Sequence, residues 1–145
     1  MYVRILVALE NGRADDALLP HVSDLARRLG SSLLLVHVAD GFAARNFASL
    51  KLAESDEIRA DRAYLDRRAA DLRVAGHAVE VQLAMGEPAR EILRVAAEHG
   101  CDMIAMGTHG HRFIGDLVHG STISEVRHKA SVPVLLVPGV VRARA

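Results

Sequence analysis

The sequence predicts an α/β protein built on one open parallel sheet. Short apolar runs alternate with helical patterns along all 145 residues, and no repeat, low-complexity stretch or linker interrupts them. A β-α-β-α-β-α-β-α-β order with right-handed crossovers produces a parallel sheet that carries helices on both faces. The length suits a single domain over residues 1–145.

Five segments have the character of strands. Residues 3–9 and 32–38 are almost continuously apolar, as expected of strands that are covered on both faces. Residues 79–83 alternate apolar with polar side chains, which is typical of a strand near the edge of a sheet. Residues 102–106 and 132–137 complete the set.

Helical patterns fill the gaps between these strands. Leu18, Val22, Leu25 and Leu29 step by four, three and four, which places them on one face of a first helix. Pro20 lies inside this pattern and predicts that the helix either starts late or is kinked. The expected consequence is an irregular first turn or a bend at this point of the chain.

The second helix has an apolar side and a charged side. Its apolar stripe consists of Ile58, Leu65, Ala69 and Leu72. The other side carries charges of both signs and is predicted to be a solvated face rather than a binding patch. These charged residues are Arg59, Asp61, Arg62, Asp66, Arg67 and Asp71.

The rest of the chain contains two further helical segments and one loop. Pro88 fits the first position of a third helix. A fourth helix is expected over residues 117–130, and residues 41–50 are interpreted as a loop because they show no clear period.

The composition excludes several classes of protein. With 50% hydrophobic residues the chain is too apolar to be disordered, and its one cysteine excludes a disulfide framework or a multi-cysteine zinc site. No apolar run approaches the ~20 residues that span a bilayer, and the start of the chain lacks a signal-peptide pattern. We therefore expect a cytoplasmic protein with no membrane partner. The 18 basic and 18 acidic residues balance, which disfavours nucleic acid as a partner.

The loops that follow the strands are the candidate ligand site, because such sheets bind ligands where the strand order reverses. The densest motif runs from Gly107 to Thr122. Gly107 and Gly110 can adopt positive φ and let a ligand approach the backbone. Gly120, Ser121 and Thr122 lie in the first turns of the last helix, where N–H groups and hydroxyls can receive a phosphate. The loop has no lysine, so it is not a lysine-bearing P-loop.

The spacing G-x2-G-x9-G-[ST], formed by Gly107, Gly110, Gly120 and Ser121, resembles the universal stress protein family. The resemblance covers essentially the whole chain, from residues 5–9 to residues 133–137. It implies an open sheet of strand order 3-2-1-4-5, membership of the ATP-binding branch of the family, and a homodimer.

The resemblance also implies which residues bind the nucleotide. Ribose and phosphates are assigned to Gly107, Gly110, Gly120, Ser121 and Thr122. The other assigned residues are Met106 and His109, which line the nucleotide, Val38, whose backbone reads adenine, and the end of the first strand at Ala8, Leu9 and Glu10. The family usually has Asp where this chain has Glu10. The extra methylene is expected to shift or weaken a contact to ribose or base.

These observations predict a nucleotide-responsive regulatory module of the stress response. The expected ligand is ATP, with AMP or ADP as alternatives and Mg²⁺ or Mn²⁺ bridging the phosphates. No evident base orients a water molecule and no lysine stabilises the transferred charge, so hydrolysis or autophosphorylation is expected to be slow and no catalytic residue is assigned. Two alternatives stay open: a nucleotide-independent dimeric scaffold for a partner protein, and a weak ATPase or phosphotransferase modified at Ser121 or Thr122.

The apolar run that begins at Val132 and ends at Val137 should form an edge strand. An exposed apolar edge promotes association unless another strand covers it. Pairing with the same strand of a second copy solves this problem, because a two-fold axis makes the two edges self-complementary. We therefore expect a homodimer through this strand, beside an unidentified regulatory partner.

Histidines are concentrated near the glycine motif. Four of the eight lie in residues 107–128, namely His109, His111, His119 and His128. His109, His111 and His119 together with Asp116 form an alternative metal site, although a ligand-lining role is favoured. Because histidine titrates near pH ~6.5, nucleotide affinity is predicted to rise on mild acidification. His37 is interpreted as a core histidine whose hydrogen bonds are satisfied.

Overall fold

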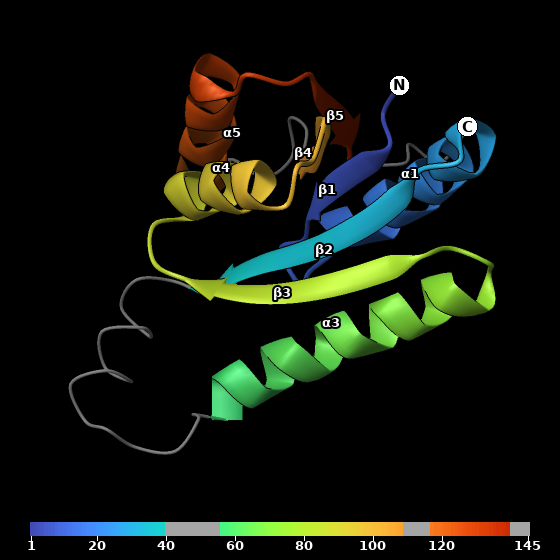
Figure 1. Ribbon diagram of the computed structural model, residues 1–145. Helices are drawn as coiled ribbons and strands as arrows, with labels where there is room; N and C mark the ends of the chain where they lie inside the picture. The colour runs from blue at the N-terminus through green and yellow to red at the C-terminus, as the bar shows by residue number, and fades with distance from the viewer. Residues whose placement is uncertain (40–55, 109–116, 140–145) are drawn as a thin grey trace, which may run out of the picture.

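The computed structural model describes residues 1–39, 56–108 and 117–139, with only the backbone of residues 117–119. Its five-stranded parallel sheet has the order β3-β2-β1-β4-β5 (Figure 1), which confirms the predicted fold. The strands are β1 (Arg4–Ala8), β2 (Ser32–Ala39), β3 (Val79–Met85), β4 (Met103–Thr108) and β5 (Val134–Pro138). The helices are α1 (Ala14–Leu29), α3 (Asp56–Val74), α4 (Pro88–Glu98) and α5 (Leu117–Lys129). The expected loop at 41–50 lies outside the described residues.

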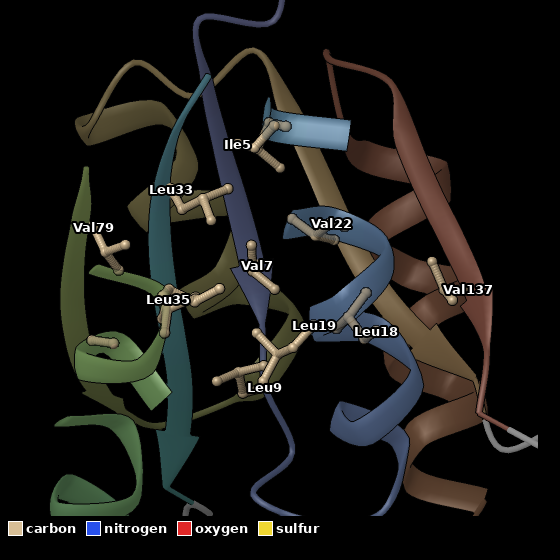
Figure 2. Close-up of a cluster of buried hydrophobic side chains, with 14 of the residues drawn as sticks. Ile5, Val7, Leu9, Leu18, Leu19, Val22, Leu33, Leu35, Val79 and Val137 are labelled. Atoms are coloured by element: carbon tan, nitrogen blue, oxygen red, sulfur yellow. The ribbon is translucent and has the colours of Figure 1, made fainter. Parts of the chain in front are cut away.

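The sheet is the middle layer of three. Helices α1 and α3 pack on one face, and α4 and α5 pack on the other (Figure 1). Side chains of a strand point alternately to opposite faces, so Ile5 and Val7 of β1 join the α1–α3 core while Leu6 joins the α4–α5 core. Figure 2 shows Val22 of α1 packed toward the β1 and β2 side chains of the first core. This double burial explains why the central strands read as unbroken apolar runs.

Helix α1 differs from the sequence expectation. It runs without interruption from Ala14 to Leu29, with Pro20 in its interior, so the predicted late start is wrong. Pro20 has no N–H to donate to the carbonyl of Asp16, but both residues are exposed and water can solvate that carbonyl. Leu29, expected on the buried face, is 43% exposed because the helix ends there, at Gly30, whose φ is 70°.

The edge strands are β3 and β5, as the sequence predicts. Strand β5 begins at Val134 rather than at residue 132. Pro133 lacks the N–H that a ladder residue supplies, although its carbonyl still accepts a hydrogen bond from the N–H of Ile104 at 3.0 Å. Among the described helices, none has the length of apolar sequence that a bilayer crossing needs.

The strand order reverses at β1. Strand β1 pairs with β2 on one side and with β4 on the other. The chain therefore runs outward in both directions from β1, and a crevice opens beyond the carboxyl ends of β1 and β4. Residues that follow these strands are brought together although they lie about a hundred positions apart in the sequence.

Candidate ligand site at the carboxyl ends of the strands

A pocket lies at this switch point, between the strand ends and the helices α4 and α5. The ends of β1, β2 and β4 supply its floor, and the first turns of α4 and α5 supply its walls. Its lining consists of Ala8, Leu9, Glu10, Val36, His37, Val38, Pro88, Ile92, Met106, Gly107, Thr122 and Ile123. Most of these groups are apolar, and the polar ones are a carboxylate, an imidazole and a hydroxyl.

The structure brings most of the residues predicted from the sequence into this pocket. The ones that line it are Ala8, Leu9, Glu10, Val38, Met106, Gly107 and Thr122. Gly120 and Ser121 do not line it, and both are exposed on α5. His109 and Gly110 lie outside the described residues. The predicted residues at the strand ends therefore line the pocket, whereas of the three predicted residues on α5 only Thr122 does.

Several lining residues were not predicted from the sequence as ligand contacts. They are Val36, His37, Pro88, Ile92 and Ile123. Ile92 was assigned to the core stripe of the third helix, and it does pack in the α4–α5 core as well as face the pocket. A signal for His37 existed in the sequence, since it immediately precedes the predicted adenine-reading position. An apolar helix residue carries no comparable signal, because core packing and pocket lining need the same side chain.

The two described glycines of the motif have different roles. Gly107 is not at positive φ, which corrects the expectation for this residue. A Cβ at Gly107 would lie 3.1 Å from Ala14 Cβ and 3.2 Å from the Ala14 carbonyl oxygen, so glycine is needed here for the close approach of α1. At Gly120, in contrast, a Cβ would meet no atom of the described residues within 4 Å. The missing side chain at Gly120 leaves open space beside the pocket.

The loop between β1 and α1 carries Glu10 and is fastened by a buried carboxylate. Asp15 is fully buried and accepts hydrogen bonds from the N–H of Glu10 at 3.0 Å and of Gly12 at 3.2 Å. The hydroxyl of Tyr64 also donates to it, at 2.8 Å. Burial raises the pKa of Asp15 above its ordinary 3.8, and the three donors offset part of that effect. Both carboxylate oxygens are therefore used within the protein, and Glu10 is the acidic group that faces the pocket.

The ring of His37 lies between β1 and α3. Its Nδ1 donates to the carbonyl oxygen of Leu9 at 2.9 Å, and its Nε2 lies 3.4 Å from Asp61 Oδ2. The hydrogen-bonding prediction for His37 is thus correct, but the ring also lines the pocket. Asp61 corrects the prediction of a purely solvated face on α3, because its side chain is only 20% exposed and contacts His37.

The start of α4 is closed to an anionic ligand. Glu87 is its N-cap, and its carboxylate accepts hydrogen bonds from the N–H groups of Ala89 at 3.3 Å and Arg90 at 2.8 Å. Pro88 occupies the first position, as predicted, and has no N–H. A phosphate at this pocket would therefore be received on the α5 side.

The metal alternative receives no support from the described residues. Within residues 1–39, 56–108 and 117–139, no three His, Cys, Asp or Glu side chains are grouped so that they could hold an ion. His109, His111 and Asp116 lie outside these ranges, as does the side chain of His119. The chemistry available in the described pocket is that of binding: apolar walls for a flat ring, and polar groups for a sugar or a phosphate.

Fold and site together define an open α/β protein with a ligand pocket at the switch point of its sheet. The sequence profile of the universal stress protein family matches residues 1–138, and the chain belongs to this family. The resemblance proposed from the glycine motif is thereby confirmed.

Individual relatives agree with this assignment. A universal stress protein of Methanocaldococcus jannaschii is 26% identical over 94% of this chain and 95% of its own length, and the structure of that protein superposes with a TM-score of 0.76 over 100% of this chain and 99% of the other. A universal stress protein of Synechocystis is 42% identical over 44% of this chain, which spans only 22% of that longer relative.

One of the similar structures contains a nucleotide. The universal stress protein of Archaeoglobus fulgidus, in complex with dAMP, is 26% identical, has a TM-score of 0.68, and is matched over 94% of this chain and 98% of its own. That nucleotide belongs to the A. fulgidus protein.

Proposed function

We propose that this protein binds an adenine nucleotide, ATP foremost, in the switch-point pocket and acts as a nucleotide-responsive regulatory module of the stress response. The observation that carries the proposal is the pocket itself, which gathers most of the predicted nucleotide residues at the strand ends. The dAMP complex of the A. fulgidus relative supports an adenine nucleotide as the ligand class. AMP and ADP are the alternatives within that class.

In the proposed arrangement, adenine lies against Val38 and the apolar walls, and ribose lies near Glu10 and Gly107. The phosphates extend toward Gly120, Ser121 and Thr122, where the open space at Gly120 allows close approach to the α5 backbone. A bound Mg²⁺ or Mn²⁺ would neutralise phosphate charge and would be held mainly by phosphate oxygens and water. Because Thr122 is buried at 8% exposure, its hydroxyl serves to orient a phosphate.

The decisive variant is Gly120→Ala. A methyl group at Gly120 meets no atom within 4 Å in the part of the chain that the structure describes, and alanine stabilises a helix interior relative to glycine by about 0.5–1 kcal/mol. The fold should therefore be unharmed, while ATP affinity measured by calorimetry should fall by about tenfold or more as backbone contacts to phosphate are lost. Ser124→Ala is the matched control, since Ser124 is exposed on the same helix and does not line the pocket.

Three outcomes separate the proposal from its alternatives. Mass spectrometry of the purified protein should detect a retained adenine nucleotide, and calorimetry should detect ATP binding. Absence of binding by the wild-type protein, with an empty site in crystals grown with ATP and Mg²⁺, would instead indicate the dimeric scaffold. Phosphate release well above background that is abolished by Ser121→Ala, with binding intact, would indicate the ATPase or phosphotransferase.

We also propose a homodimer through the β5 edge. The carbonyl of Pro133 points toward β4, and neighbouring residues of a strand alternate in direction, so Val134 and Leu136 direct their backbone groups to the other edge. Sedimentation should show a dimer, and Val134→Pro, which removes one outward N–H but leaves the β4 ladder intact, should weaken it. A wild-type protein that stays monomeric at its highest soluble concentration would contradict this arrangement.

A further inference from the structure

The segment that leads from β1 into α1 is fixed at each of four consecutive residues. The carbonyl of Leu9 accepts from His37 Nδ1 at 2.9 Å, and the N–H groups of Glu10 and Gly12 donate to Asp15 at 3.0 and 3.2 Å. The Asn11 side-chain amide donates to α3. We call residues 9–12 the β1–α1 segment. Leu9 and Glu10 of this segment line the pocket, so its conformation decides where the Glu10 carboxylate points.

Helix α3 is linked to this segment through Tyr64, by way of Asp15. The Tyr64 hydroxyl donates to Asp15 Oδ2 at 2.8 Å, on the carboxylate that receives the N–H groups of the segment. Arg68, one turn later on α3, donates from Nε to the Tyr64 oxygen at 3.2 Å and from a terminal nitrogen to Asp16 at 2.7 Å. A continuous hydrogen-bonded chain therefore runs from Arg68 through Tyr64 and Asp15 to the backbone of Glu10.

The second contact of α3 is made by Asp61. Asn11 Nδ2 donates to the backbone oxygen of Asp61 at 3.3 Å and to its carboxylate Oδ1 at 3.0 Å. The other carboxylate oxygen lies 3.4 Å from Nε2 of His37, the residue that donates to Leu9. Asp61 and Tyr64 are three residues apart, so they lie on the same side of α3.

Asn11 shows that holding the β1–α1 segment in this conformation costs free energy. Its φ is +59°, in the left-handed region, and its side-chain Oδ1 is buried without a hydrogen-bond partner among residues 1–39, 56–108 and 117–139. Left-handed backbone and an unpaired buried acceptor each cost free energy, and such costs persist where the surrounding structure over-determines the conformation. They gather at functional sites more often than elsewhere, and here they lie one residue from the pocket.

We propose that α3 positions the ligand-binding end of β1, with Tyr64 and Asp61 as positioning residues that set nucleotide affinity without touching the nucleotide. The helix packs on the sheet face opposite the one that carries α4 and α5. Beyond the carboxyl end of β1, its Asp61 nevertheless contacts Asn11, and its Tyr64 contacts Asp15, which holds the backbone of residues 10 and 12. This inference rests on the proposed function, because Glu10 is the group being presented to the ribose. It predicts that affinity depends on side chains in the layer that does not line the pocket.

The test compares Tyr64→Phe and Asp61→Asn with Ser23→Ala. Tyr64→Phe removes only the hydroxyl, and Asp61→Asn removes the charge and replaces one of the two acceptor oxygens by an NH2 donor. Ser23→Ala deletes a comparable hydrogen bond, 2.8 Å long, between α1 and His77 after α3, and Ser23 does not line the pocket. Each α3 variant should weaken ATP binding about fivefold, the loss of roughly one hydrogen bond. Ser23→Ala should leave the affinity unchanged.

Two further measurements make the outcome unambiguous. Affinity for 2′-deoxy-ATP should fall less than affinity for ATP, because the displaced Glu10 is directed at the ribose. Amide exchange at Glu10 and Gly12 should speed up in Tyr64→Phe and not in Ser23→Ala. Equal ATP affinity in all variants would overturn the proposal. If the wild-type protein binds no adenine nucleotide, the proposed function falls and amide exchange alone decides: unchanged exchange in Tyr64→Phe then overturns the positioning role.

Discussion

The two ends of β1 are each fastened by an aspartate that accepts two backbone N–H groups. At the amino end, Asp102 accepts from Val3 at 2.9 Å and from Arg4 at 3.1 Å. At the carboxyl end, Asp15 accepts from Glu10 and Gly12 at 3.0 and 3.2 Å. The hydrogen bonds are alike, but Asp15 is fully buried whereas Asp102 is partly exposed to water.

The pKa values of the two carboxyls shift in opposite directions, because Asp15 is buried much more deeply than Asp102. Burial is the largest influence on the Asp102 carboxyl and raises its pKa, but the N–H groups of Val3, Arg4 and Asp102 itself, together with the positive N-terminus, outweigh it, so its pKa lies below 3.8. For Asp15, burial outweighs three donors and the pKa lies above 3.8. The amino end of β1 is thus held by a carboxylate that water can reach. The carboxyl end accepts an unfavourable buried charge in order to fix the segment that carries Glu10.

The two ends of β1 should differ most in the free energy of unfolding that is lost when the carboxylate at each end is removed. Asp15→Ala removes, at a fully buried position, the acceptor of the N–H groups of Glu10 and Gly12 and of the hydroxyl of Tyr64, and should lower the free energy of unfolding by about 3 kcal/mol. Asp102→Ala should cost less, because water can reach the N–H groups of Val3 and Arg4. Urea unfolding at neutral pH measures both losses, and an equal or greater loss in Asp102→Ala would break the comparison.

A smaller effect is expected for two glycines near the ends of β4, Gly107 inside the strand and Gly100 before it. Gly107→Ala at the carboxyl end brings a methyl group to 3.1 Å from Ala14 Cβ, and overpacking of this kind costs about 1–2 kcal/mol. Gly100→Ala at the amino end meets no atom within 4 Å but must adopt a φ of +64°, which costs about 1 kcal/mol. Thermal unfolding should rank them in that order. Only Gly107→Ala should also weaken nucleotide binding, and equal binding by both variants would contradict this.

The outcome at these residues also shows what the sequence could and could not predict. The strands and the residues at their carboxyl ends follow from short-range patterns, because all parallel strands deliver their carboxyl ends to one edge. The strand order, in contrast, was an implication of the family resemblance. The contacts of Asp61 and Tyr64 depend on how α3 is rotated about its own axis, which a charge pattern does not reveal. The sequence indicated that Gly107 can adopt positive φ and let a ligand approach the backbone, but it did not show the close approach of Ala14, a long-range contact with α1.

Acid titration should sharpen the comparison of the two carboxylates. Carbon NMR of the aspartate carboxyls should give a midpoint below 3.8 for Asp102 and above 3.8 for Asp15. A lowered folded pKa means that the stability contributed by Asp102 is present above 3.8 and is lost as pH falls through its folded pKa. For Asp15 the sign is opposite: the pH-dependent part of its contribution is present below 3.8 and is lost as pH rises through its raised pKa, while its hydrogen bonds to Glu10, Gly12 and Tyr64 stabilise the fold at neutral pH. Midpoints in the reverse order would refute this assignment.

The last prediction concerns the partner that Asp15 has and Asp102 lacks. Burial and the hydrogen bond to Asp15 raise the pKa of Tyr64 from 10.0 to about 12. The chain has two tyrosines, so Tyr2→Phe leaves Tyr64 as the sole chromophore, and its absorbance should reach half-ionisation at about pH 12. Because the folded pKa is raised, the stability that Tyr64 contributes is present below pH 10.0 and is lost as pH rises through about 12. An ordinary midpoint near 10.0 would show that the phenol does not donate to Asp15. The series of hydrogen bonds that connects α3 to the backbone of Glu10 would then lack the bond between Tyr64 and Asp15.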